Sequence, residues 1–263
     1  NDNVNNIENL LNNFSVIYKF NNKMFEHVID DSLFICAYEF LDCNCILKNP
    51  ELKICFIDVL NYFSSRNNSI YCKFVNENIN NYFKILIDNY IFMETSLNEN
   101  QVVNKIVTQS NIICLFIDSF NYNFNIKYTF DIFAKNNEKI INKFINIFLT
   151  NFMIKYDEVV KYLKSIKEAQ NHNSVNSILV LNLKVYNSEL YNYLLFLKVV
   201  CSKIINNLLA FGNKDKFCSS INILLDILVG KNKNEINIKN KEDYKFQPLL
   251  YLELLYNIFI VCK

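Results

Sequence analysis

Glycine and proline are almost absent from this chain of 263 residues, which contains two of each. Phosphate-binding loops, tight hairpin turns and doubly wound sheets all need glycine where the backbone turns sharply or passes close to another group. Helices joined by short turns need far less of it, because asparagine also tolerates the left-handed conformation at a helix end. The scarcity therefore favours an all-α protein. The four residues are Pro50, Gly212, Gly230 and Pro248.

Apolar residues recur along most of the sequence with the 3.6-residue period of a helix. Aromatic and β-branched residues are common enough to permit strands. However, the apolar runs are too long and too rarely interrupted by turn residues for a β protein. We predict about ten helices, at residues 4–20, 23–46, 50–65, 70–93, 99–120, 126–135, 138–170, 177–211, 215–229 and 248–262.

Some helix ends are signalled by single residues. Asn49 precedes Pro50, which places an N-cap side chain before a proline at the first helical position. Pro248 is predicted to begin the last helix in the same way. Gly212 and Gly230 each follow an apolar run, and we predict that both end their helices in the left-handed conformation.

Helices with short connections form either a bundle or a solenoid of helix pairs. No fixed repeat is visible, so a solenoid would be a degenerate, armadillo-like one. We expect one helical core over residues 1–263, with a candidate flexible joint at 167–176. The 230–248 loop is long, but apolar residues alternate within it, so we predict that it is ordered, with Tyr244 and Phe246 at least half buried against the helices at 215–229 and 248–262.

The charge distribution argues against two classes of partner. The formal net charge is +1 and the charges are spread along the chain, so the basic footprint of a nucleic-acid-binding protein is missing. The apolar runs are interrupted or shorter than the roughly 20 residues that a membrane span requires. We therefore expect neither nucleic acid nor membrane as a partner.

No catalytic or metal-binding constellation is recognisable. The nine cysteines include no CxxC pair, and the spacing of Cys43 and Cys45 is wrong for zinc, so we expect small buried thiols in a reducing compartment. The two histidines, His27 and His172, lie in unrelated polar stretches. Acidic pairs, such as Glu242–Asp243, are typical of helix starts and solvated faces. We expect no catalytic residue, no cofactor and no metal.

The stretch "KFINIFLTNFMIKYDEVVKYLKSIKEAQ" (143–170) is predicted to be one long helix. Asn146 and Asn151 fall in its apolar half, and we expect both to be buried amides that bond to the backbone at helix crossings. Asp157 and Glu158 precede Lys161 by four and three residues, which favours a salt bridge over acid–base chemistry. The predicted core stripe consists of Phe152, Tyr156, Val159, Val160, Leu163 and Ile166.

Four stretches, taken in order, carry a further signal: "LDCNCILKNPELKICFIDVLNYF" (41–63), "CLFIDSFNYNFNIKYTFDIF" (114–133), the 143–170 stretch, and "ILLDILVGKNKNEINIKNKEDYKFQPLLYLELL" (223–255). Together they resemble the ubiquitin conjugation factors of the E-four class, a family of U-box ubiquitin ligases that elongate ubiquitin chains. Gln170 and Lys239 fall in register with this family. So do further positions that we expect to be structural: Asn49, Pro50, Asp118, Phe124, Asn125, Lys127, Tyr128, Asn146, Asn151, Asp157, Glu158, Gly230, Tyr244, Phe246 and Pro248.

The sequence departs from the family pattern in three places. The linker before residue 124 is shorter than in the family, "GKNK" at 230–233 stands where the family has "GPKC", and Lys241 replaces a proline.

The resemblance implies an elongated, armadillo-like helical-repeat core that acts as a scaffold. In the family a U-box follows the last helix and recruits a ubiquitin-conjugating enzyme, so we expect a U-box downstream of this core. The implied partners are ubiquitylated substrates and an AAA ATPase segregase, in proteasomal degradation in the cytoplasm or nucleus. We expect a monomer. The alternative, motivated by the fold alone, is a non-catalytic helical-repeat adaptor in trafficking or nuclear transport.

Overall fold

The computed structural model of the chain describes residues 31–42, 50–65, 69–96, 102–122, 124–172, 174–209 and 213–262, together with the single positions 6, 9 and 13. Every regular element in these ranges is a helix, which confirms the all-α prediction. The chain divides into two compact units, residues 1–133 and 134–263. Apart from positions 6, 9 and 13, the predicted helix at 4–20 falls outside the described residues, as do both ends of the predicted helix at 23–46. No helix in the described part of the chain is both long and apolar enough to cross a membrane.

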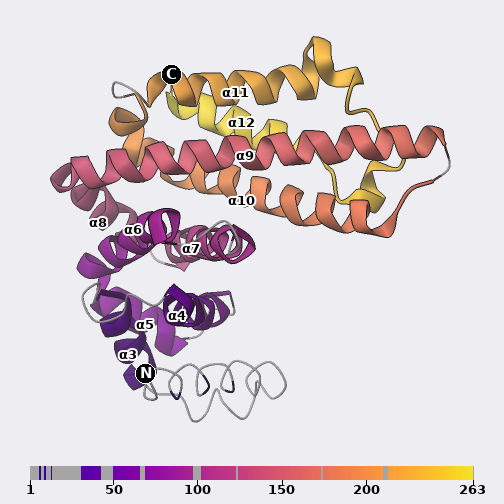
Figure 1. Cartoon of the computed structure of the whole chain (residues 1–263). Coiled ribbons are helices and arrows are strands. Elements are labelled where there is room, and N and C mark those ends of the chain that lie inside the picture. Colours follow the sequence, from indigo (N-terminus) through magenta and orange to yellow (C-terminus); the bar gives the residue numbers. More distant parts are fainter. Residues whose placement is uncertain are drawn as a thin grey trace. The chain divides into compact units, whose positions relative to one another are not determined.

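The first unit is held together by aromatic side chains from several short helices. The rings of Phe34 and Phe63 meet edge to face at 5.1 Å between centroids, and those of Phe83 and Phe130 at 4.8 Å. Such edge-to-face contacts add to the free energy gained by burying the rings. The helices are α3 (Asp31–Asp42), α4 (Pro50–Ser64), α5 (Ser69–Glu77), α6 (Ile79–Ser96), α7 (Val102–Tyr122) and α8 (Phe124–Asn136), the last of which crosses the boundary between residues 133 and 134 (Figure 1).

The helix predicted at 70–93 is two helices, because the chain turns at Asn78. The Asn78 side-chain amide donates a hydrogen bond to the Phe74 carbonyl at 2.9 Å, and the Asn78 backbone N–H bonds to the same carbonyl. A side chain that competes for a helical carbonyl in this way favours a turn over a continuous helix. The prediction of one helix was therefore wrong at this residue.

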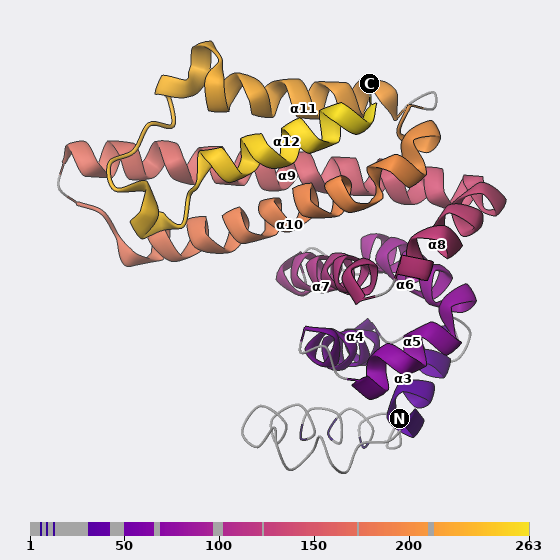
Figure 2. The same cartoon turned by 180° about the vertical axis from the view of Figure 1, so that it is seen from behind.

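The second unit is a four-helix arrangement whose centre is the long pair α9 and α10. In Figures 1 and 2, α9 runs antiparallel to α10, and α11 runs antiparallel to α12. α10 packs on both α9 and α12, and α11 packs on both α9 and α12, so the four helices close around one core. They are α9 (Glu138–Asn171), α10 (Ser177–Leu208), α11 (Lys214–Val229) and α12 (Pro248–Cys262), with the short 3-10 helices η2 (Lys231–Asn234) and η3 (Lys241–Tyr244) between α11 and α12.

The seam between α9 and α10 is aromatic. Phe148 stacks on Tyr193 with ring centroids 4.7 Å apart, and Phe144 meets Phe196 edge to face at 5.9 Å. Most of the predicted stripe of α9 is buried here, and only Val160 is half-buried. Burying a side chain such as Phe148 contributes about 1.5–3 kcal/mol, so this seam supplies much of the unit's stability.

A buried ion pair crosses the same seam. The Lys155 ammonium donates to the Glu189 carboxylate at 2.6 Å, and the two side chains are only 3% and 9% exposed. Burial lowers the pKa of Lys155 and raises the pKa of Glu189, while the attraction between the two charges opposes both shifts. Each charge therefore depends on the other for its place in the core.

We predict that Glu189→Leu lowers the free energy of unfolding by about 3–5 kcal/mol, because it leaves the Lys155 charge buried without its carboxylate. Lys155→Met should have a similar effect. The double variant should recover wild-type stability or exceed it, because two apolar side chains need no partner. Urea unfolding of all four proteins measures this cycle. Additive losses in the double variant would contradict the coupling.

Asp118 in α7 gives a second prediction. Its carboxylate is half-buried and accepts a hydrogen bond from the Ser64 hydroxyl at 2.9 Å. Burial is the larger influence and raises the pKa of Asp118 above its usual 3.8, although the Ser64 bond lowers it. The folded state therefore takes up this proton at a higher pH than the unfolded state. The resulting stabilisation grows as the pH falls from the raised pKa towards 3.8 and is complete below 3.8.

Asp118→Asn should remove this pH dependence while keeping an acceptor for Ser64. Relative to the variant, the wild type should gain stability as the pH is lowered from 7 towards 4, as measured by urea unfolding at each pH. Asp215→Asn, at an exposed position, is the matched control. A difference in the free energy of unfolding between wild type and Asp118→Asn that is the same at every pH would contradict the raised pKa.

Candidate functional site

The last turns of α9 fasten the 230–248 loop to the second unit. The Gln170 side-chain amide donates to the Lys239 carbonyl at 3.0 Å and accepts from the Lys239 N–H at 2.9 Å. The same amide group donates to the Tyr244 hydroxyl at 3.0 Å. Gln170 thus pairs with the loop backbone as a neighbouring strand would, using both ends of its amide. We call Gln170, Lys239 and Tyr244 the loop clamp.

Charged contacts extend the clamp towards the start of the loop. The Lys164 ammonium pairs with Glu235 at 2.7 Å, and Lys167 donates to the Asn234 carbonyl. Residues 167–171, part of the stretch considered as a flexible joint, continue α9 as helix. The last turns of α9 therefore hold the loop through Lys164, Lys167 and Gln170.

The loop also places apolar side chains in the core. Tyr244 and Phe246 are 8% and 3% exposed, so their predicted burial is confirmed. Phe246 lies with residues of α11 and α12, as predicted, and its ring is 6.0 Å from that of Tyr251. Tyr244 differs from the prediction, because η3 packs on α10 and the Tyr244 hydroxyl contacts α9.

Two loop residues adopt the left-handed conformation, one on each side of η3. Asn240 has φ 52° and Lys245 has φ 53°. Asparagine accepts this conformation readily, whereas for lysine it costs on the order of 1–2 kcal/mol. The Lys245 backbone is held by two hydrogen bonds: its carbonyl accepts from the Asn187 side-chain amide at 2.6 Å, and its N–H donates to the Glu242 backbone carbonyl at 3.0 Å.

Asn187 is the centre of a buried network on α10. Besides bonding to Lys245, it accepts hydrogen bonds from the Tyr251 hydroxyl through its side-chain oxygen and, at 3.0 Å, through its carbonyl. Burial raises the pKa of Tyr251 well above its usual range, so the hydroxyl stays protonated and donates. The network joins α10, the loop and α12.

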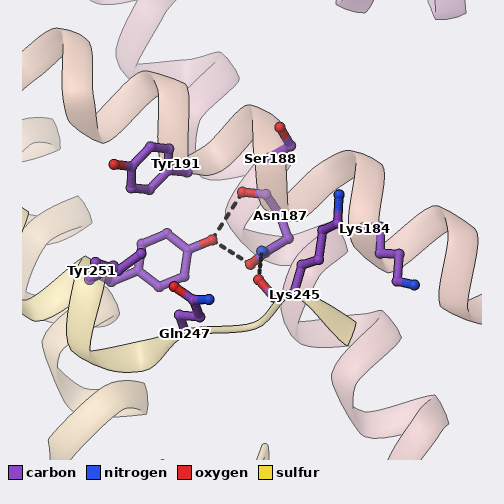
Figure 3. Close-up of a pocket in the computed structure, with 8 residues that line it drawn as sticks. Lys184, Asn187, Ser188, Tyr191, Lys245, Gln247 and Tyr251 are labelled. Atoms are coloured by element: carbon purple, nitrogen blue, oxygen red, sulfur yellow. Dashed lines mark hydrogen bonds between the residues drawn. The ribbon is translucent and has the colours of Figure 1, made fainter. Parts of the chain in front are cut away.

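A pocket opens beside this network, as Figure 3 shows. Its volume is about 360 Å³, and it lies between one face of α10 and the segment from Lys245 to Tyr251. We call it the α10 pocket. Its lining residues are Lys184, Asn187, Ser188, Tyr191, Lys245, Gln247, Leu250 and Tyr251.

The asparagines of α9 do not share one environment. Asn151 is buried, as predicted, at 6% exposure. Asn146 is exposed and accepts a hydrogen bond at 2.6 Å from Lys216 of α11, so the prediction of a buried amide bonded to backbone was wrong. Asn146 and Thr150, one turn apart, both meet the Lys216 ammonium at the rim between the helices, where water also reaches.

Glu158 and Asp157 also differ from each other. The Lys161 ammonium bonds to both carboxylate oxygens of Glu158 at 3.0 Å, as the three-residue spacing predicts. Asp157 is exposed and is not the carboxylate that Lys161 selects. Partial loss of water around the Asp157 carboxylate, and then the charge of Glu158, raise the pKa of Asp157.

Gly230 ends α11, but with φ −80° and ψ −158° instead of the predicted left-handed conformation. Close packing explains the glycine. A Cβ here would lie 2.2 Å from the Asp226 carboxylate and 2.6 Å from the Asp226 carbonyl. The Asp226 carboxylate folds back over Gly230 to accept hydrogen bonds from the Lys231 N–H and the Asn232 amide.

The other family-motif positions that the structure describes lie on helices. Pro50 and Pro248 begin α4 and α12, as predicted. Tyr128 on α8 is 68% exposed. Phe124, Asn125 and Lys127 lie within α8, but their side chains fall outside the described part. Asn49 and Gly212, two predicted helix ends, lie wholly outside the described residues.

Sequence patterns did not single out the buried lysines. Lys53 on α4 is fully buried, and its ammonium donates to Asn89 at 2.9 Å and to the Leu41 carbonyl. Lys155 in the second unit is likewise buried and hydrogen-bonded to a buried partner. The sequence signal for such a buried lysine is its position among apolar helical residues. The sequence does not reveal its partner, because Glu189 lies 34 positions after Lys155.

The described cysteines are less buried than expected. Cys201 is buried, whereas Cys36 and Cys218 are exposed. Among the residues that the structure describes, no three His, Cys, Asp or Glu side chains gather closely enough to hold a metal ion.

We predict that Gln170→Met loosens the 230–248 loop, because it removes the two hydrogen bonds that hold the Lys239 backbone, each of which contributes about 0.5–1.5 kcal/mol. Limited trypsin digestion followed by mass spectrometry should show faster cleavage after Lys239 and Lys241. Glu168→Met, at an exposed position two residues earlier, is the control and should leave the cleavage rate unchanged. Equal cleavage in wild type and Gln170→Met would contradict the clamp.

Comparison with known proteins adds one decisive finding to this geometry. A family model described as the ubiquitin elongating factor core matches residues 5–263. No curated protein matches the chain. The match includes the loop clamp, the α10 pocket and the four stretches whose resemblance was noted in the sequence. Because it spans almost the whole sequence, the chain belongs to the ubiquitin elongating factor core family.

Proposed function

We propose that this chain is the scaffold core of a U-box ubiquitin ligase that elongates ubiquitin chains on substrates. The observation that carries the proposal is the family match over residues 5–263. In this proposal the core holds an already ubiquitylated substrate, and a U-box that follows the core recruits the charged ubiquitin-conjugating enzyme.

The described motif positions support a scaffolding role. Gln170 and Tyr244 bond to each other, Phe246 fills the core, and Gly230 leaves room for the folded-back Asp226 side chain. The hydrogen bonds and packing contacts of these residues hold the loop in position. Their arrangement therefore favours a role in holding the fold over a role in bond chemistry.

The proposal extends to the cellular setting. We place the protein in the cytoplasm or nucleus, as a monomer, in proteasomal degradation. An AAA ATPase segregase that extracts ubiquitylated substrates is the proposed partner beside the conjugating enzyme. The resemblance of the four stretches supports the degradation pathway and the segregase partner, and each of these proposals is open to a binding or localisation experiment.

Chain elongation can be tested with the full-length protein that contains this core. A substrate carrying one ubiquitin is incubated with ubiquitin, the activating enzyme, a conjugating enzyme and the full-length protein, and chain length is followed by immunoblotting. We expect long chains with the protein and short ones without it. A version in which an unrelated helical-repeat domain of similar length replaces residues 1–263 should keep autoubiquitylation but lose elongation on the substrate.

Two results would contradict the proposal. Chains no longer than those made by the conjugating enzyme alone would exclude elongation. Equal elongation by the version with the replaced core would exclude the scaffolding role. An adaptor in trafficking or nuclear transport rests on the helical fold alone. It would be supported by a purified transport cargo that binds this chain when ubiquitin-pathway proteins do not.

A further inference from the structure

The α10 pocket is built by two parts of the chain that are far apart in sequence. Lys184, Asn187, Ser188 and Tyr191 follow the i, i+3, i+4, i+7 spacing and so share one face of α10. The opposite wall is the segment that leaves η3 and enters α12. Figure 3 shows the Lys245 side chain extending along α10 beside Asn187, with Lys184 next to it on the helix.

The pocket is positively charged. It is lined by two lysines and by no aspartate or glutamate. In the part of the chain that the structure describes, neither Lys184 nor Lys245 forms a salt bridge, whereas Lys155, Lys161 and Lys164 in the same unit all do. Ser188, Tyr191 and Gln247 add polar groups that can donate hydrogen bonds. The two ammonium groups are therefore available to an anionic ligand.

The position of Lys245 is costly for the protein to maintain. A left-handed φ of 53° would suit glycine, which lacks the Cβ that makes this conformation unfavourable. The buried Asn187 amide holds the Lys245 carbonyl, so the residue cannot relax into another conformation without breaking that bond. Strained backbone residues cluster at functional sites, and here the strained residue places a charged side chain along a pocket.

The size and lining of the pocket restrict the ligand. A volume of about 360 Å³ lies in the range of pockets that bind small molecules or several side chains. The half-exposed surfaces of Tyr191 and Leu250 offer apolar contacts next to the two ammonium groups. A ligand that matches both features has carboxylates beside an aromatic or aliphatic side chain.

We propose that the α10 pocket binds an acidic peptide segment of a partner protein, in which carboxylates flank an aromatic or aliphatic residue. The carboxylates bond to Lys184 and Lys245, and the apolar side chain lies against Tyr191 and Leu250. Attraction between opposite charges selects the segment, and burial of the apolar side chain adds affinity. This site does not depend on the proposed function in chain elongation.

The test uses the whole chain and a fluorescein-labelled six-residue peptide in which aspartates flank a tyrosine and a leucine. A matched peptide with asparagine in place of each aspartate is the neutral control. Fluorescence anisotropy should show tighter binding of the acidic peptide, and this preference should weaken as salt screens the charges. Inorganic phosphate at equal charge concentration should compete poorly, because it cannot make the apolar contacts.

Three variants assign the binding to the pocket. Lys184→Met and Lys245→Gly should each weaken the acidic peptide about 10-fold or more, as expected for the loss of one charged hydrogen bond. Lys245→Gly is especially informative, because glycine favours the left-handed backbone and the thermal stability should be kept or raised. Lys198→Met, at an exposed position on α10 outside the pocket, should bind as the wild type does.

Each of three outcomes would overturn the proposal. The first is equal binding of the acidic and neutral peptides. The second is wild-type affinity in folded Lys184→Met and Lys245→Gly. The third is full displacement of the peptide by phosphate at equal charge, which would show a simple anion site instead of a peptide site.

Discussion

The second unit depends on the packing of α9 along α10. The aromatic seam of Phe144, Phe148, Tyr193 and Phe196 fixes how the two helices lie against each other, and the Lys155–Glu189 pair fixes their register. A slip of one helix along the other would separate two charges that water cannot reach, at a cost of several kcal/mol. Once the register is fixed, Gln170 of α9 lies within hydrogen-bonding distance of Lys239, and Asn187 of α10 lies within hydrogen-bonding distance of Lys245. Both contacts to the loop therefore depend on the same seam.

This dependence explains why positions far apart in the sequence share one family pattern. Gln170 and Tyr244 belong to two different stretches that resemble the family, and they are hydrogen-bonded to each other. Phe246, from the later stretch, lies near Tyr156 and Val159 of the earlier one. The pattern therefore describes one structural assembly, in which a loop with little helix of its own is held by residues of α9, α10 and α12.

The sequence predicts much of this fold, because helix signals are local. The apolar period locates α9 and α12 closely, Pro50 and Pro248 mark helix starts, and alternating apolar residues predict the buried loop. The failures have non-local or competing causes. Asn78 turns the chain by bonding to a carbonyl that a helix would use. Asn146 lies on the rim, and only the position of Lys216 reveals this.

The candidate site was less predictable than the fold. Nothing in the sequence around Lys245 indicates a left-handed lysine, and nothing around Lys184 indicates that the two ammonium groups line one pocket. Both follow from Asn187, which holds the loop from a helix 58 residues earlier in the chain. Long-range hydrogen bonds of this kind are set by tertiary packing, which the periodicity of one helix does not encode.

The central claim is that the family pattern encodes a loop fixed on a helical scaffold, and native-state hydrogen exchange of the Lys239 amide tests it most directly. This N–H donates to Gln170, outside any regular helix. We expect the Lys239 amide to exchange as slowly as amides in the last turns of α9, because both open together. Exchange at the rate of an unstructured peptide would show that the loop is not fixed and would contradict this claim.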